Sequence, residues 1–234
     1  MAMSMGAAGD NYDRHRWVEG CSLEPIPSHR GEYLWIDYKM QNSIAVHGSN
    51  KITKYDIVQV YKVKNSNLWG RYVARRSLLA KDLSPGEKVE EERLFHGTNF
   101  ADQIVKKGFK VKHADPQGMF GKGIYFSNLS SKSTQYTLEG GTAPCQPHNA
   151  VYCTTCVRKM LICRVALGKS YVATSAMNGI DQAPRGYHSV TAKPTSGVLN
   201  FPEYIVYDND QAYPGYLVEY KICAEKTRKS GSRH

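Results

Sequence analysis

The sequence has no long uncharged apolar run and no segment that resembles a secretory signal. A helix that spans a bilayer needs roughly 20 mostly apolar residues. A signal needs an apolar core and a cleavage pattern, and residues 1–16 have neither. These absences argue against a membrane partner and predict an intracellular protein, in the cytoplasm, the nucleus or both.

Internal repeats and low-complexity tracts are also absent, and 234 residues are enough for one well-buried domain but scarcely for two. An apolar share of 41% and a charged share of 22% argue against wholesale disorder. We therefore expect a flexible segment over residues 1–18, one domain over 19–224 and a flexible tail over 225–234.

Positive charge is in excess, with 31 Lys and Arg against 21 Asp and Glu and a net charge of +10. Such an excess indicates an anionic partner, such as nucleic acid, a phosphorylated ligand or an anionic polymer. The alternative is that the scattered lysines only solvate the surface, because no block of like charges appears.

Apolar patterning predicts two helices, followed by a second half made nearly entirely of strands. The helices are expected at residues 68 to about 83 and at 100–107, the second ending at Gly108. The apolar stripe of the first consists of Trp69, Tyr72, Val73 and Leu79. The expected strands are residues 57–63, 94–96, 123–126, 160–167, 203–207 and 216–222. This order predicts an α+β fold with a mostly antiparallel sheet and flanking helices.

Glycine-rich phosphate cradles are not supported. Gly-Met-Phe-Gly-Lys-Gly at residues 118–123 has Gly after Lys122 and precedes a strand, so it is not a P-loop. No strand is followed by G-x-G-x-x-G, and no G-x-S-x-G elbow occurs.

Three cysteines and a histidine have metal-ligand spacing. They are Cys145, His148, Cys153 and Cys156. Three thiolates and one imidazole suit a tetrahedral Zn²⁺ with no open position, which predicts a structural zinc loop over residues 145–156. The alternative is a set of surface thiols without metal. Cys163 lies in a strand pattern and is expected to be a small core residue.

Four motifs occur in a fixed order along the chain. They are Leu-Phe-His-Gly-Thr at 94–98, the glycine-rich segment 118–126, Ser-Lys-Ser-x2-Tyr at 131–136 and Pro-Glu-Tyr-Ile-Val-Tyr-Asp at 202–208. In these motifs the sequence resembles the poly(ADP-ribose) polymerase catalytic domain, a diphtheria-toxin-like ADP-ribosyltransferase with a His-Tyr-Glu signature. It looks closest to the tankyrases, whose catalytic domain carries a similar zinc loop. The resemblance covers about residues 50–223.

The resemblance implies an NAD⁺-dependent glycosyltransferase that moves ADP-ribose to protein acceptors, itself included, and extends poly(ADP-ribose). Glu203 would stabilise the developing ribose cation and orient the nucleophile. His96 would bind the ribose hydroxyls. The backbone of Gly97 and the hydroxyl of Ser133 would bind the nicotinamide amide.

Further contacts with NAD⁺ follow from the same resemblance. Tyr125, counted with Glu203 and His96 as catalytic, and Tyr136 would sandwich the nicotinamide ring. Thr98 stands where tankyrases have Ser, and His113 matches a histidine of the loop over the donor site. Taken singly, each of these residues has an ordinary structural explanation, such as a core aromatic side chain or a satisfied histidine.

Two departures and three hypotheses remain. Lys110 replaces an acidic tankyrase residue, and Lys122 stands where tankyrases have Ala. The hypotheses are a polymerase, a mono-ADP-ribosyltransferase, and a module that contains zinc and binds RNA or poly(ADP-ribose) without turnover. Because no autoinhibitory helical region precedes the motifs in this sequence, we expect activity that does not require DNA.

Overall fold

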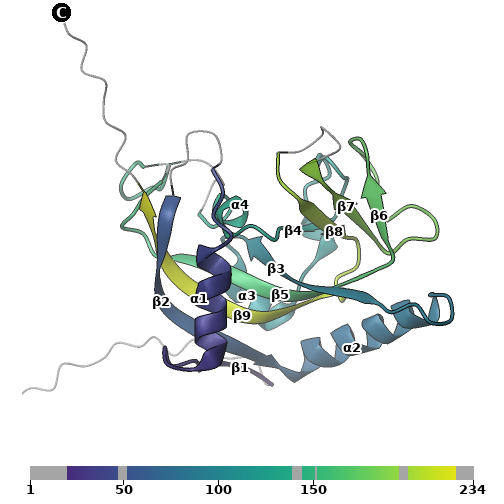
Figure 1. Ribbon diagram of the computed structural model, residues 1–234, viewed down its shortest axis with the longest axis horizontal. Helices are drawn as coiled ribbons and strands as arrows, with labels where there is room; N and C mark the ends of the chain where they lie inside the picture. The colour runs from purple at the N-terminus through teal and green to yellow at the C-terminus, as the bar shows by residue number, and fades with distance from the viewer. Residues whose placement is uncertain (1–19, 47–51, 139–143, 151, 195–199, 225–234) are drawn as a thin grey trace, which may run out of the picture.

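The computed structural model describes residues 20–46, 52–138, 144–150, 152–194 and 200–224 (Figure 1). The terminal segments expected to be flexible, 1–18 and 225–234, lie outside the described residues.

The larger sheet has five antiparallel strands in the order β1-β2-β9-β5-β3. Their bounds are β1 Cys21–Pro25, β2 Ile52–Asn65, β9 Ala212–Ala224, β5 Arg158–Gly168 and β3 Glu90–Gly97. β5 and β9 lie in the interior of the sheet, between β2 and β3.

The smaller sheet has four strands in the order β4-β8-β7-β6. Their bounds are β4 Ile124–Phe126, β8 Glu203–Val206, β7 Ser189–Ala192 and β6 Ser170–Ala173. The β6–β7 pair is parallel and the other two pairs are antiparallel. The expected α+β class with mostly antiparallel sheets is confirmed.

The two sheets meet where β3 and β4 end. Phe95 and Ser127 exchange both backbone hydrogen bonds, with N···O distances of 2.8 Å and 3.0 Å. This bridge brings the His96–Gly97 end of β3 next to β4, which is already paired with β8. Segments far apart in the sequence therefore meet at one edge.

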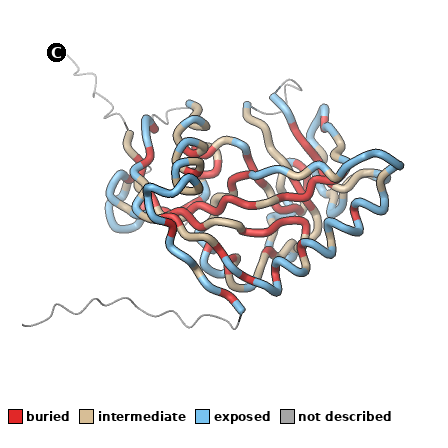
Figure 2. Tube along the Cα trace, turned by 60° about the horizontal axis from the view of Figure 1, so that its bottom comes forward, coloured by how far each residue is buried: buried red, intermediate tan, exposed pale blue. Residues whose placement is uncertain are grey.

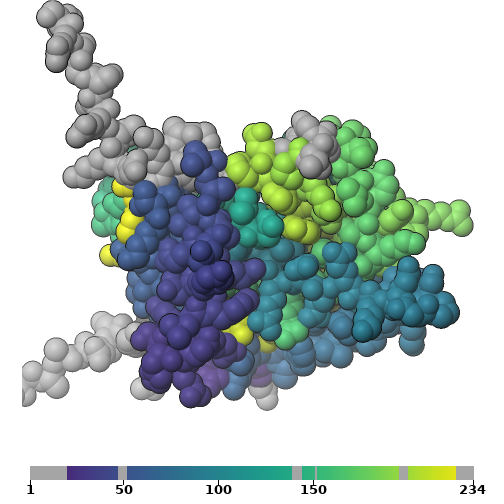
Figure 3. Space-filling view, in the orientation of Figure 1, coloured from purple at the N-terminus to yellow at the C-terminus, as the bar shows by residue number. Residues whose placement is uncertain are grey.

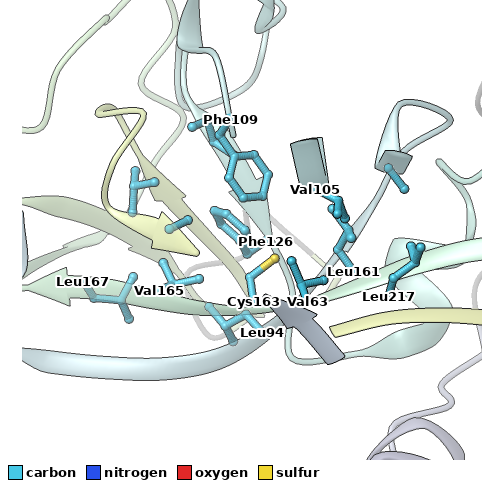
Figure 4. Packing of buried hydrophobic residues seen from close by; sticks show 14 of the residues in the cluster. Val63, Leu94, Val105, Phe109, Phe126, Leu161, Cys163, Val165, Leu167 and Leu217 are labelled. Carbon is cyan, nitrogen blue, oxygen red and sulfur yellow. The ribbon is translucent and has the colours of Figure 1, made fainter. Parts of the chain in front are cut away.

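Both faces of the larger sheet are covered, because successive side chains of a strand point to opposite faces. Leu94 packs with Val105 and Phe126 on the face that carries α3 (Figure 4). Phe95 packs on the other face, with Ile36 of α1. Figure 2 shows the buried residues running along the strands while the helices expose their outer sides.

Four α-helices and a short 3₁₀ helix are present in the described part of the chain. Their bounds are α1 Gly31–Gln41, α2 Ser66–Lys81, α3 Ala101–Lys107, α4 Ser130–Thr134 and η1 Val111–His113. None of these is long and apolar enough to span a membrane. α3 ends at Gly108, whose φ is 77°, as the sequence predicts. The sequence analysis did not predict α1, β1, α4, β6 and β7.

α2 corrects one expectation in detail. The side chain of Asn65 caps its start by accepting from Leu68 N at 3.1 Å. The side chains buried along α2 are Leu68, Tyr72 and Leu79, whereas Trp69 is 42% exposed. Tyr72 and Leu79 were correctly assigned to the buried stripe, but Trp69 and Val73 were not.

Candidate functional site

His96 is oriented by a backbone carbonyl. Its Nδ1 lies 2.8 Å from the carbonyl oxygen of Tyr125, which can only accept, so Nδ1 carries the proton. Burial lowers the pKa of His96 to about 4, against the opposing effect of that hydrogen bond. The ring lies between Phe109 and Phe126, at centroid distances of 5.1 Å and 5.4 Å. Near neutral pH, Nε2 therefore carries a lone pair that can accept a hydrogen bond from a ligand hydroxyl.

Gly97 is packed directly against the backbone of α4. A Cβ atom built on Gly97 would lie 1.7 Å from the carbonyl oxygen of Ser133, so no other residue fits there without movement. Ser133 is 4% exposed, and its hydroxyl has no hydrogen-bond partner in the part of the chain that the structure describes. The backbone of Gly97 thus lies against the backbone of the residue that carries this unpaired hydroxyl.

The β4–β8 ladder places Tyr125 and Glu203 on one face. Tyr125 is opposite Ile205, and Glu203 lies two residues before Ile205 along β8. The hydroxyl of Tyr125 donates to Gly121 O at 2.8 Å and accepts from Phe120 N at 2.9 Å. Burial raises the pKa of Tyr125 to about 12, and the charge of Glu203 adds to this. The phenol therefore stays protonated and bonded to its own loop, which leaves the ring for a stacking contact.

Glu203 is held by a lysine to which the sequence analysis gave no role. Lys132 Nζ lies 3.1 Å from Glu203 Oε1, and their side chains are 21% and 12% exposed. Burial is the largest single influence and lowers the pKa of Lys132, but the charge of Glu203, the ring hydroxyl of Tyr136 and hydrogen bonding to both together raise this pKa above its usual value. The same Nζ lies 5.7 Å from the ring centroid of Tyr136. The only available signal was its place between the two serines of the third motif.

We use the name β3–β8 cluster for the residues that these contacts connect. They are His96, Gly97, Tyr125, Lys132, Ser133, Tyr136 and Glu203. Among the described residues no hydrogen bond or ion pair joins His96 to Glu203, and each is connected to Tyr125 from its own side. Their convergence on one dinucleotide stays a prediction.

Thr98 and His113 stand apart from the β3–β8 cluster. The hydroxyl of Thr98 accepts from Phe100 N at 3.1 Å, where α3 starts. His113 is exposed and ends η1. Among the described residues, no side-chain hydrogen bond or ion pair joins either residue to the cluster, so their assignment to NAD⁺ stays a prediction.

The glycines of the loop before β4 allow its backbone to pack closely against another loop. Gly121 has a φ of 73°, and a Cβ atom there would lie 1.9 Å from the carbonyl oxygen of Ile180. Lys122 N donates to that same carbonyl at 2.7 Å. The loop thus lies against the segment between β6 and β7.

The four predicted metal ligands lie together, and we call them the Cys/His cluster. Their ligand atoms are all within 4.8 Å of one another. The Sγ atoms of Cys145, Cys153 and Cys156 lie 3.7, 3.4 and 3.4 Å from Nδ1 of His148. In a tetrahedron with Zn–S of about 2.3 Å and Zn–N of about 2.0–2.1 Å, sulfur and nitrogen are about 3.6 Å apart. The donor set and its spacing are therefore compatible with zinc.

The thiols differ in their protonation. Burial raises the pKa of Cys153, but the backbone N–H groups of Cys156 and Thr155 lower it to about 6. Cys156 N lies 3.3 Å from the sulfur of Cys153. A preformed thiolate of this kind is the form that binds a metal ion.

Sequence comparison identifies the family. The profile described as "Poly(ADP-ribose) polymerase catalytic domain" matches residues 32–198, which is more than half of the chain and ends before Glu203. A "Poly [ADP-ribose] polymerase 1" of Arabidopsis thaliana is 26% identical over 242 residues, covering 86% of this chain and 22% of the relative. A "Poly [ADP-ribose] polymerase" of Sarcophaga peregrina is 30% identical over 186 residues, covering 76% and 16%.

A further relative is named for a different product. The "Protein mono-ADP-ribosyltransferase PARP3" of Mus musculus is 29% identical over 184 residues, covering 77% of this chain and 30% of the relative. This chain thus spans less than a third of the length of these three relatives. The motifs, the fold and the profile match agree, and the chain belongs to the family of poly(ADP-ribose) polymerase catalytic domains.

Proposed function

We propose that this chain transfers ADP-ribose from NAD⁺ to protein acceptors and releases nicotinamide. The observation that carries the proposal is the ion pair of Glu203 with Lys132, on the face of β8 that also carries Tyr125. In a member of this family, that carboxylate is the group we assign to the reacting ribose.

The nicotinamide end of NAD⁺ would lie at Gly97 and Ser133. The backbone of Gly97 would pair with the amide, and the unpaired hydroxyl of Ser133 would add a donor. The ring of Tyr136, which is 47% exposed, and that of Tyr125 would stack on the pyridinium. A cation–π contact weakens as the positive charge leaves that ring, so stacking alone does not drive the reaction.

The chemical step would depend on Glu203. Its Oε1 is occupied by Lys132, and Oε2 has no hydrogen-bond partner among the described residues. Oε2 is therefore available for a ribose hydroxyl, and the carboxylate can stabilise the cation that forms as the bond to nicotinamide breaks. The lone pair on Nε2 of His96 would accept from a second ribose hydroxyl and fix the bent substrate. These residues bind and orient the donor until an acceptor nucleophile attacks.

The Cys/His cluster would hold a structural zinc ion. All four positions of a tetrahedral ion are filled by protein ligands, so the metal would supply cross-linking and no chemistry at the ribose. This cluster is also what supports a tankyrase-like member within the family.

Chain extension is the finer part of the proposal. We favour a polymerase, because mono-transferases of the family usually have an apolar residue at the position of Glu203. Mono-transfer is the second candidate, favoured by the relative that carries that name. The partners would be NAD⁺, acceptor proteins, the chain itself and growing poly(ADP-ribose), without a requirement for DNA.

Labelled NAD⁺ tests the proposal directly. A ladder of high mass supports a polymerase, a single added unit supports mono-transfer, and no transfer contradicts both. The third alternative, a module without turnover, would bind RNA or poly(ADP-ribose) with an affinity that falls steeply with salt. A need for nicked DNA would contradict activity independent of DNA.

The Glu203→Gln variant tests the assigned carboxylate. We expect turnover to fall by about 100-fold or more, with NAD⁺ binding changed less than about threefold. Glu92→Gln, which alters an exposed carboxylate on β3, is the matched control and should change neither. Retained chain growth in Glu203→Gln would refute the role of Glu203.

A further inference from the structure

A cavity of about 460 Å³ lies on the α1 face of the larger sheet, where α1 and α2 begin. Glu32 of α1, Trp69 of α2 and Arg93 of β3 are among the residues that line it. Figure 3 shows this face, with α1 in purple and α2 in blue. Arg93 precedes Gly97 by four residues in the same strand, which is roughly 13 Å in an extended chain. The cavity is therefore separate from the β3–β8 cluster.

Two arginines lie directly opposite each other in this cavity. Arg93 of β3 pairs in register with Arg164 of β5, and both line the cavity. Like charges directly opposite in a sheet are destabilising. Arg164 is compensated by Glu91 at 2.7 Å, whereas Arg93 has no carboxylate within ion-pair distance among the described residues. Because only Arg164 has a carboxylate partner, the guanidinium of Arg93 is left to bind an external anion.

Other groups at the cavity add to this preference. Lys62 also lines it, although Glu32 lies 2.9 Å away. Ser66, the first residue of α2, also lines the cavity, so the positive end of the helix dipole lies at the same place, although Ser66 N and Leu68 N already donate to Gly20 O and to the side chain of Asn65. The cavity thus favours phosphate, in agreement with the net charge of +10.

Aromatic side chains form the walls on both sides of the arginines. Trp69 is 42% exposed, and the guanidinium of Arg164 lies 5.7 Å from its ring centroid. On the α1 side, Tyr216 lines the cavity and packs at 6.1 Å on Trp35, which lies outside the lining and 4.8 Å from Arg93 by its ring centroid. Flat rings beside guanidinium groups stack on aromatic ligands, as in nucleotide-binding sites.

The cavity is deepened by a glycine at an irregularity of β9. The β5–β9 register shifts between Ile162 and Cys163, and Gly215 lies at that shift. A Cβ atom on Gly215 would contact only the carbonyl oxygen of Ile162, at 3.5 Å, so space above it is open. A side chain at this position would fill the cavity without backbone strain.

We propose that this cavity binds a nucleoside phosphate, with the phosphate on Arg93 and the base beside Trp69. A volume of about 460 Å³ lies within the range of small-ligand pockets. The same chemistry is present in a free nucleotide and in one unit of poly(ADP-ribose), so the ligand is an adenine nucleotide unit from either source. The site is independent of the chemical step at Glu203.

Calorimetric titration with ADP tests the proposal. The β3–β8 cluster is itself expected to bind ADP, so the unmodified chain should show two binding components. Arg93→Gln should weaken one component by about tenfold or more. Gly215→Val, which changes no charge, should weaken the same component. Arg185→Gln, at an exposed arginine outside the cavity, is the matched control and should keep both. Turnover of NAD⁺ should stay within about twofold in all three variants, which separates this result from the proposed function.

The outcomes decide the proposal. Equal ADP affinity of Arg93→Gln and Arg185→Gln overturns it, even if Gly215→Val fails to fold. Inorganic phosphate that binds as tightly as ADP also overturns it, because the aromatic walls would then contribute nothing. Loss of one component in both cavity variants supports it. In that case, tighter binding of an ADP-ribose oligomer than of monomeric ADP-ribose assigns the ligand to the polymer, and equal binding assigns it to a free nucleotide.

Discussion

The β3–β8 cluster and the Cys/His cluster are assembled in opposite ways. His96 and Glu203 come from distant parts of the sequence and are positioned by strand pairing. The four residues of the Cys/His cluster are close in sequence and meet through their side chains, with Cys145–Ala150 as an isolated bridge. The first cluster depends on the whole fold, whereas the second depends on local turns and, we infer, on a metal ion.

The side chains of the β3–β8 cluster that form its ion pair are also more buried than two of the ligands in the Cys/His cluster. Glu203 and Lys132 are 12% and 21% exposed and lie beside buried strands, so their geometry is preorganised. His148 is exposed and Cys156 is part-buried, in a loop with few apolar side chains. Changes in the first cluster should therefore reduce turnover, and changes in the second should reduce stability.

Gly97→Ala should have the largest effect, because it separates the two elements that form the first cluster. The new methyl group must displace the carbonyl of Ser133, which lies 1.7 Å from its position. A shift of about 1 Å in a reacting geometry costs about 100-fold in rate, and overpacking costs about 1–3 kcal/mol of stability. Turnover of labelled NAD⁺ and thermal unfolding measure the two effects.

The matched control is Gly70→Ala in α2. A Cβ atom there meets nothing within 4 Å, so the helix should gain about 0.5–1 kcal/mol and turnover should not change. Normal activity in Gly97→Ala would show that the close contact between β3 and α4 is not needed for the reaction.

Loss of the metal should affect the second cluster with the reverse selectivity. Cys153→Ser, or a strong chelator, should lower the free energy of unfolding by about 4 kcal/mol. Affinity for a nicotinamide mimic should change much less, because the zinc would have no open position. Metal content and thermal unfolding are the measurements. Cys223→Ser alters a cysteine of β9 outside the cluster and serves as the control. Selective loss of turnover in a folded, metal-free chain would argue for a catalytic metal.

Features that depend on residues close in sequence could be predicted, whereas those that depend on distant residues could not. Local spacing correctly predicted that the four ligand residues of the Cys/His cluster would lie together. Strand β5 was predicted at residues 160–167, and it extends from Arg158 to Gly168. The prediction was close because both faces of this strand are buried, so its apolar run is nearly continuous. β2 was predicted only at 57–63, because its first residues alternate with exposed polar side chains.

α1 shows why other elements could not be predicted. Its buried residues Ile36 and Met40 have helical spacing, but Leu34 and Tyr38, which are 56% and 68% exposed, blur the apolar stripe. The role of Lys132 depends on a partner far along the chain, which no local pattern contains. The hydrogen bonds of the Tyr125 hydroxyl likewise depend on how its loop folds back.

Replacing Lys132 sharpens the comparison within the first cluster. Lys132→Met removes the partner of Glu203 and leaves a part-buried carboxylate without compensation. We expect kcat to fall by about 30-fold, while KM for NAD⁺ changes less than about threefold. Lys132→Arg keeps the charge and should restore most of the rate. A higher KM for NAD⁺ with an unchanged kcat would mean that Lys132 binds substrate and does not position Glu203.

The smallest expected effect is a pH dependence carried by His96. Burial lowers its pKa from 6.5 to about 4 in the folded chain, so folding favours the neutral ring. The stability that it contributes is present above about pH 6.5 and is lost as the pH falls toward 4. Relative to His96→Gln, the unmodified chain should lose about 1 kcal/mol of unfolding free energy between about pH 7 and 5.5. The zinc concentration must be constant, so that the Cys/His cluster contributes equally to both. Parallel pH profiles for the two chains would mean that the folded protein accommodates a charged ring at position 96, and Nε2 would then donate to the ribose instead of accepting from it.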